Sequence, residues 1–128
     1  MSTSAQLLSD SDLEYLNSKG LNFEVKAYGN EIHVIIKEFE LPAHYTPKRC
    51  NLLLRLPPGY PGTNPDMFWT NPDVRLVNGG VPIAAQVTEN LGGVSWQRWS
   101  RHNNAWRPGI DDIQTKLRAV RTELEKGR

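Results

Sequence analysis

The sequence predicts an α+β domain in which an antiparallel sheet comes before a long C-terminal helix. Apolar side chains recur at every second position between residues 22 and 56, the pattern of strands with one buried face. Between residues 110 and 124 they recur at spacings of three and four, which is typical of one face of a helix. Nine prolines and ten glycines exclude an all-helical fold. At 128 residues, the chain is expected to form one domain, residues 1–128.

A short helix is expected near the N-terminus, after residues 1–8, which are predicted to be frayed. Ser9 or Ser11 can cap this helix, because a side-chain hydroxyl there can accept a free backbone N–H of the first turn. Ser11 and Glu14 also have the spacing of a capping box. The helix is predicted to run through Asn17.

Three strands are predicted to follow as an antiparallel meander, over residues 22–27, 31–37 and 50–56. Gly29 and Asn30 supply a two-residue hairpin turn between the first two strands. Cys50 is in register with the leucines of the third strand, so it is predicted to be a small core residue rather than a reactive thiol.

A proline-rich loop occupies residues 57–65, where four prolines in nine residues exclude a helix or a central strand. Residues 67–69, Met-Phe-Trp, are predicted to form a fourth strand. From Asn71 to about Ala105 little periodicity remains, and we expect a long irregular loop. Its glycine pairs, at 79–80 and 92–93, lack the spacing of a phosphate-binding loop and are interpreted as turns.

The C-terminal helix is the clearest element. Its apolar face is predicted to consist of Ile110, Ile113, Leu117, Val120 and Leu124. Pro108 precedes the helix, and Asp111 and Asp112 are expected in its first turn, where acidic side chains suit the helix dipole.

Composition narrows the class of protein. The 15 basic and 14 acidic side chains give a net charge of +1, which argues against non-specific nucleic-acid binding. No stretch reaches the roughly 20 apolar residues of a membrane helix, so no membrane segment is expected. The first residues lack the pattern of a secretory signal and the chain has one cysteine, so we expect a reducing, cytoplasmic setting.

No metal or cofactor site is predicted. His33, His44 and His102 are far apart in the sequence, and none has the spacing of a zinc-binding motif. His33 alternates with the apolar residues of its strand, so it is predicted to face solvent.

A run rich in tryptophan and arginine lies before the last helix, and it permits more than one interpretation. Tryptophan and arginine are enriched at interface hot spots, so the run could be a binding surface; the tryptophans could equally cover the core. The candidate binding residues are Trp96, Arg98, Trp99, Arg101, His102 and Trp106. Ser95 and Ser100 are weak candidate nucleophiles, with His102 as a general base.

In this order, the elements over about residues 22–125 resemble the ubiquitin-conjugating (E2) fold. Residues 60–65, Tyr-Pro-Gly-Thr-Asn-Pro, are similar to the Y-P-x-x-x-P flap that follows the third strand in E2 and RWD domains. Residues 106–108, Trp-Arg-Pro, resemble the tryptophan-x-proline step before an E2 helix. The chain is most similar to prokaryotic E2 family E, which implies operons that also encode ubiquitin-like proteins, E1-like enzymes and JAB-type peptidases.

The departures from the E2 pattern concern the active site. Asn71, Pro72 and Asp73 stand where an active E2 carries His-Pro-Asn, and Pro82 stands where its catalytic cysteine is expected. Counting back from Trp106 instead places the site near residues 98–99, again without a thiol. A carboxylate at Asp73 would oppose a developing oxyanion, which the E2 asparagine stabilises.

The resemblance therefore implies a non-catalytic E2-like adaptor, a variant of the E2 fold without its cysteine. Its partners would be an E1-like enzyme, a ubiquitin-like protein or both, bound through the flap around Tyr60 and residues 94–107. One alternative is an active E2 that forms an oxyester on Ser95 or Ser100. Another is an RWD-like interaction domain. The oligomeric state and the isomer of the Tyr60–Pro61 bond remain open.

Overall fold

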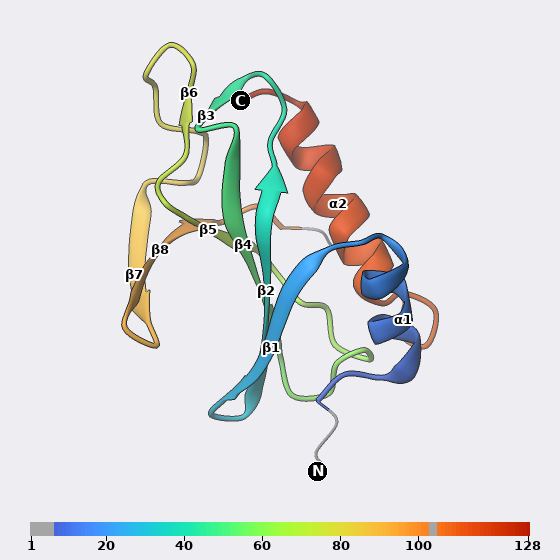
Figure 1. Cartoon of the computed structure of the whole chain (residues 1–128). Coiled ribbons are helices and arrows are strands. Elements are labelled where there is room, and N and C mark those ends of the chain that lie inside the picture. Colours follow the sequence, from blue (N-terminus) through green and yellow to red (C-terminus); the bar gives the residue numbers. More distant parts are fainter. Residues whose placement is uncertain (1–6, 103–104) are drawn as a thin grey trace.

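The computed structural model describes residues 7–102 and 105–128. Figure 1 shows helix α2 lying along one side of the main sheet, with α1 near its first turn and the small β3–β6 pair near its last. The elements are α1 (Asp10–Ser18), β1 (Asn22–Tyr28), β2 (Glu31–Glu40), β3 (Tyr45–Thr46), β4 (Arg49–Leu56), β5 (Phe68–Asn71), β6 (Arg75–Leu76), β7 (Val87–Leu91), β8 (Val94–Trp99) and α2 (Ile113–Glu125).

The main sheet has six strands in the order β1-β2-β4-β5-β8-β7, and all neighbouring strands are antiparallel. The predicted meander is confirmed as β1, β2 and β4, with its hairpin turn at residues 29–30. The fourth strand is confirmed as β5, which begins at Phe68, one residue later than predicted. The predicted α+β class, with a short N-terminal helix and a C-terminal helix, is therefore confirmed.

Helix α1 begins after Ser9, whose hydroxyl accepts the backbone N–H of Asp12 at 3.1 Å. The first of the two predicted caps is thus the one used. Leu8 is 4% exposed and belongs to the main core together with partly buried Leu13, as often occurs for the residue before an N-cap. Predicted fraying is therefore wrong at Leu8, whereas residues 1–6 lie outside the described part of the chain.

The main core lies between the sheet and the two helices. It combines residues of alternating positions on β2 and β4 with the inner face of α2, and Cys50 is among them at 3% exposure. The prediction that Cys50 is a core residue is confirmed. Burying such side chains provides roughly 25 cal/mol for each Å² of apolar surface removed from water, which makes this layer the main source of stability.

The opposite face of the sheet is also partly buried, which contradicts the prediction of a single buried face. A second apolar cluster there consists of Ile35, Leu53, Trp69 and Trp96. His33 lies on this face and is 3% exposed, with its ring stacked on Tyr28 at 4.6 Å between centroids. The predicted exposure of His33 is wrong because aromatic side chains, not solvent, cover this end of the face.

The segment predicted to be irregular contains the hairpin β7–β8. Gly92 and Gly93 form its two-residue turn, with φ angles of 60° and 82° that favour glycine at both positions. The interpretation of this pair as a turn is confirmed, but a loop throughout residues 71–105 is wrong. Both faces of β8 are covered and its Gln97 is buried, so the strand shows no alternation of apolar and polar residues.

Helix α2 begins at Ile113, three residues later than its predicted apolar face. The carboxylate of Asp112 accepts the backbone N–H of Gln114 at 3.1 Å, and the Thr115 hydroxyl accepts the N–H of Asp112 at 3.3 Å. This capping box fixes the first turn, so Ile110 precedes the helix and is 66% exposed. The other four predicted apolar positions are buried.

A buried amide joins β5, β8 and the segment between β5 and β7. The Gln97 side-chain oxygen accepts the N–H of Val74 at 2.7 Å and the hydroxyl of Thr70 at 2.9 Å. Its nitrogen donates to the carbonyls of Val74 and Ala85, both at 3.0 Å. The indole of Trp99 donates to the same Thr70 hydroxyl at 2.8 Å. Gln97 thereby satisfies three backbone groups that are shielded from water.

A second polar junction joins α1, the proline-rich loop and α2. The Tyr60 hydroxyl donates to Asp12 Oδ2 at 2.8 Å, and the backbone N–H of Ile113 approaches Asp12 Oδ1 at 3.5 Å. Asp12 is only 2% exposed, and burial raises the pKa of its carboxyl despite these hydrogen bonds. Burial and the neighbouring carboxylate also raise the pKa of Tyr60.

Replacing Gln97 with alanine should lower the free energy of unfolding by about 3 kcal/mol, because it strips partners from buried backbone groups. Gln86→Ala removes the same side chain at an exposed position and should change stability little. Urea unfolding followed by tryptophan fluorescence measures both. Equal effects of the two substitutions would contradict the role given to Gln97.

Asp12→Asn should change the pH dependence of stability in one direction. The folded protein holds the Asp12 proton more tightly than the unfolded chain, so the stability linked to this group is present at low pH. It is lost as the pH rises through the folded pKa, whereas asparagine does not titrate. The free energy of unfolding of the unmodified chain, relative to Asp12→Asn, should fall as the pH rises above about 4. A flat or rising difference would refute the assignment.

Candidate functional site

The residues that stand in the place of the E2 active site have structural roles here. Asn71 is the last residue of β5, and its amide donates to the carbonyl of Ser95 at 2.9 Å. Asp73 is exposed, with a carboxylate oxygen 3.8 Å from the guanidinium of Arg75. Pro82 is buried, and its carbonyl accepts the N–H of Ala85 at 3.2 Å. None of these side chains carries a thiol or a hydroxyl group.

The flap, residues 57–65, is fixed by hydrogen bonds to the Tyr60 hydroxyl and to the Pro61 carbonyl. The tyrosine hydroxyl is bound to Asp12, as described above, and the Tyr60–Pro61 bond is cis. The Trp106 indole N–H donates to the carbonyl of Pro61 at 2.8 Å, and its ring lies 6.3 Å from the Tyr60 ring. Tyr60 is therefore half-buried and fixed, while Pro61, Gly62 and Thr63 remain exposed.

Two of the predicted binding residues are removed from the accessible surface. Trp99 is fully buried and stacks on Phe68 with centroids 5.1 Å apart. Trp96 is 3% exposed within the second apolar cluster, on the opposite face of the sheet. For these two side chains the core-covering interpretation describes the structure, whereas Trp106 is half-buried against the flap.

The two arginines of the run are also engaged. Arg98 donates to the Ser100 hydroxyl at 3.1 Å and lies 3.9 Å from the carboxylate of Glu89. Arg101 stacks its guanidinium on the Trp99 ring at 4.8 Å and donates to the carbonyls of Ile83, Glu123 and Arg128. The Arg101 side chain is 6% exposed, so it acts chiefly as a link between β8 and α2.

His102 pairs with an acid instead of a serine. Its Nδ1 lies 2.6 Å from Asp66 Oδ2, and the imidazole is 56% exposed. Ser95 and Ser100 are separated by five residues, roughly 17 Å along an extended chain, so they belong to different places. Within residues 7–102 and 105–128, no hydrogen bond joins His102 to either serine.

The chain has no solvent-accessible thiol. Cys50 is the one cysteine of the sequence and is 3% exposed. Burial raises the pKa of its thiol to about 12, so the thiolate is not formed at neutral pH. The described residues contain no cluster of three or more His, Cys, Asp or Glu side chains suited to a metal ion. Their helices include none that is long and apolar enough to cross a membrane.

The sequence interpretation missed one feature, a cavity of about 670 Å³ between α2 and residues Phe68, Arg101, His102 and Ala105. Lys116 lines the cavity and is 5% exposed, although it is a lysine on an amphipathic helix. A signal was available, because position 116 lies three residues after Ile113 and four before Val120, on the buried face.

Comparison with known proteins agrees with the fold and with the flap. A model of prokaryotic E2 family E matches residues 8–127, nearly the whole chain. Searches of the curated proteins and of the solved structures gave no significant match. On the family match, together with the sheet, flap and C-terminal helix described above, the chain belongs to prokaryotic E2 family E.

Proposed function

We propose that this protein is a non-catalytic E2-like adaptor that binds an E1-like enzyme, a ubiquitin-like protein or both. Membership of the family supports a role in prokaryotic ubiquitin-like conjugation. The observation that carries the adaptor proposal is the position of Cys50. A conjugating enzyme of the thioester type needs an exposed, ionisable thiol, and the one thiol here is buried with a raised pKa.

The surroundings of the E2 active-site position support the same proposal. An oxyanion is stabilised by donors aimed at the site where charge develops. The Asn71 amide is committed to the Ser95 carbonyl, and Asp73 presents a carboxylate, which cannot donate when ionised. Neither residue is poised to stabilise an acyl-transfer transition state.

The proposed docking surface is the exposed part of the flap, Pro61, Gly62 and Thr63, together with His102 and Trp106. The Trp106–Pro61 and Tyr60–Asp12 hydrogen bonds fix this surface before a partner arrives. Such a preformed surface avoids the entropy cost of ordering a loop on binding.

An oxyester enzyme is the second candidate, and one contact favours it. The short His102–Asp66 contact is the kind that orients an imidazole as a general base, with Ser100 two residues away in the chain. In this alternative an acyl group would rest on the Ser100 or Ser95 hydroxyl. An RWD-like interaction domain is the third candidate, since it shares the flap.

The decisive experiment mixes the purified chain with an E1-like enzyme and a ubiquitin-like protein of a prokaryotic conjugation system, plus ATP. We expect a stable complex on a sizing column, and no adduct that is cleaved by thiol reductant or by hydroxylamine. An adduct that resists reductant but yields to hydroxylamine would overturn the adaptor and support the oxyester. If neither a complex nor an adduct forms, the remaining candidate is an RWD-like domain that binds other partners.

Thr63→Arg should weaken this complex at least about tenfold, because it places a long charged side chain on the flap. Thr88→Arg makes the same change at an exposed position of β7 and serves as the matched control. Isothermal titration calorimetry measures both. Equal affinities for the two variants would refute the flap as the docking surface.

The thiol of Cys50 should resist labelling in the folded protein. We expect no reaction with N-ethylmaleimide at pH 7.5 over an hour, and full reaction after unfolding in urea, since burial withholds both access and ionisation. Intact mass detects the addition. Fast labelling of the folded chain would contradict the observation on which the adaptor proposal depends.

A further inference from the structure

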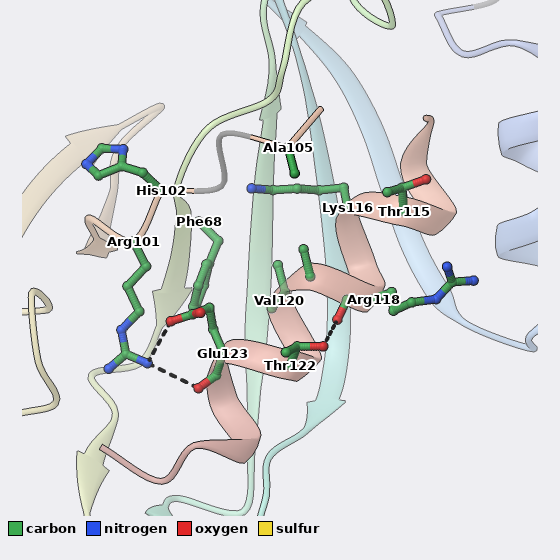
Figure 2. A pocket seen from close by; sticks show the side chains of 11 residues that line it. Phe68, Arg101, His102, Ala105, Thr115, Lys116, Arg118, Val120, Thr122 and Glu123 are labelled. Atoms are coloured by element: carbon green, nitrogen blue, oxygen red, sulfur yellow. Dashed lines mark hydrogen bonds and ion pairs between the residues drawn. The ribbon is translucent and has the colours of Figure 1, made fainter. Parts of the chain in front are cut away.

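The cavity beside α2 combines an apolar wall with charged groups. Phe68 and Val120 contribute to its wall, and in Figure 2 they lie between Lys116 and Glu123. Arg101 and Glu123 stand at one end, where they form an ion pair at 3.9 Å. The volume, about 670 Å³, is within the range of sites that hold small ligands or the end of an extended chain.

Lys116 is a buried residue that lines this cavity. In Figure 2 its side chain extends from α2 along the cavity towards Ala105. The residue is 5% exposed, and burial is the largest influence on its ammonium group. Burial of the residue removes part of the hydration of its ammonium group, so the charged form is disfavoured.

The nearby carboxylate compensates only in part. Asp66 attracts the Lys116 ammonium by charge, but its Oδ2 is committed to His102 at 2.6 Å. Its Oδ1 is buried and has no hydrogen-bond partner within the described residues. Asp66 therefore acts on the Lys116 ammonium group through its charge, without a direct ion pair.

The balance of these effects leaves Lys116 unusually easy to deprotonate. Burial lowers its pKa to about 8, against the opposing attraction of Asp66. The other charged groups of the cavity are His102, which pairs with Asp66, the Arg101–Glu123 pair, and Arg118, which is exposed. At pH 7.5 about a quarter of the amine is then neutral, against roughly one part in a thousand for an ordinary lysine.

We propose that Lys116 is a nucleophile that accepts an acyl group from a thioester whose acyl end enters this cavity. The neutral Nζ attacks the thioester carbonyl carbon, the new N–C bond forms, and the C–S bond breaks. The thiolate leaves and is protonated by the proton that Nζ loses, through water in the open cavity. The products are an amide on Lys116 and a free thiol.

This inference rests on the proposed function, because conjugation of ubiquitin-like proteins supplies thioesters of their C-terminal carboxyl groups. It adds an acceptor for the acyl group, which the adaptor role leaves unspecified. That acceptor is a lysine on the adaptor's own helix α2. Of the six lysines in the chain, Lys116 is the one that is buried in the described structure, the other five being exposed.

A small probe tests the reactivity without any partner protein. The folded chain is incubated at pH 7.5 with S-acetyl-N-acetylcysteamine, and acetylated lysines are mapped by peptide mass spectrometry. Lys116 should be acetylated about tenfold faster than exposed Lys126, since its neutral fraction is far larger while its basicity is lower. A rate no greater than that of Lys126 would overturn the proposal.

The pH profile separates a reactive amine from a merely accessible one. The Lys116 rate should reach half its maximum near pH 8, and Asp66→Asn should shift this midpoint downwards because it removes the attraction that holds the proton. An unchanged or raised midpoint in Asp66→Asn would refute the electrostatic account. Lys116→Met, which replaces the buried amine with an apolar chain of similar length, should fold and lose the fast acetylation.

The two proposals fail in different ways. With the E1-like enzyme, the ubiquitin-like protein and ATP, we expect an adduct that resists both reductant and hydroxylamine and is absent in Lys116→Met. A stable complex without fast acetylation of Lys116 by the small thioester would overturn this inference and leave the adaptor intact. Fast acetylation without any complex would support the reactive lysine and remove the adaptor.

Discussion

The segment between β5 and β7 is largely exposed but is attached to the sheet at buried Val74 and Ala85, and one side chain makes that attachment possible. Gln97 pairs with both backbone groups of Val74 and with the carbonyl of Ala85. Without such partners, a buried loop would carry unsatisfied donors and acceptors, each costing about 1–3 kcal/mol. The position of Pro82, and hence the geometry where an E2 carries its cysteine, depends on this amide.

Under the proposed function, the same constraint separates this protein from a thioester-forming E2. Its frame is complete: the sheet, the flap with the Tyr60–Asp12 junction, and the helix that follows Trp106. The region that would carry the reaction is instead held by structural hydrogen bonds, with Asn71 fixing the start of β8. A rigid binding surface does not require a nucleophile. Recognition needs shape and fixed hydrogen-bond donors, whereas acyl transfer also needs an ionisable group.

The sequence predicted those helices and strands that have one buried face and one exposed face. Residues 22–56 alternate because one side of each strand meets the core, and four apolar positions of α2 repeat because they do the same. The signal failed where both faces are covered. His33 and the strand around Gln97 are polar yet buried, through aromatic stacking and hydrogen bonds that involve residues distant in sequence. No local pattern encodes those partners.

The candidate site shows the same limit. Composition and spacing predicted that no thiol stands at the E2 active-site position, since Cys50 is in register with core leucines. The burial of Trp99 and the pairing of His102 with Asp66 were not, because each depends on how β5 and the segment after β8 meet. Lys116 was readable in principle from its helical spacing, but lysine is so seldom buried that spacing alone gives it little weight.

The division of the four tryptophans has a spectroscopic consequence. Trp69, Trp96 and Trp99 are at most 3% exposed, in surroundings that shift indole emission to shorter wavelengths, whereas Trp106 is half-buried at the flap. Collisional quenchers such as iodide reach the flap indole far more readily than the other three. The quenchable part of the emission is therefore an intrinsic, label-free reporter of whatever covers the flap, read against an internal background that changes only when the sheet itself comes apart.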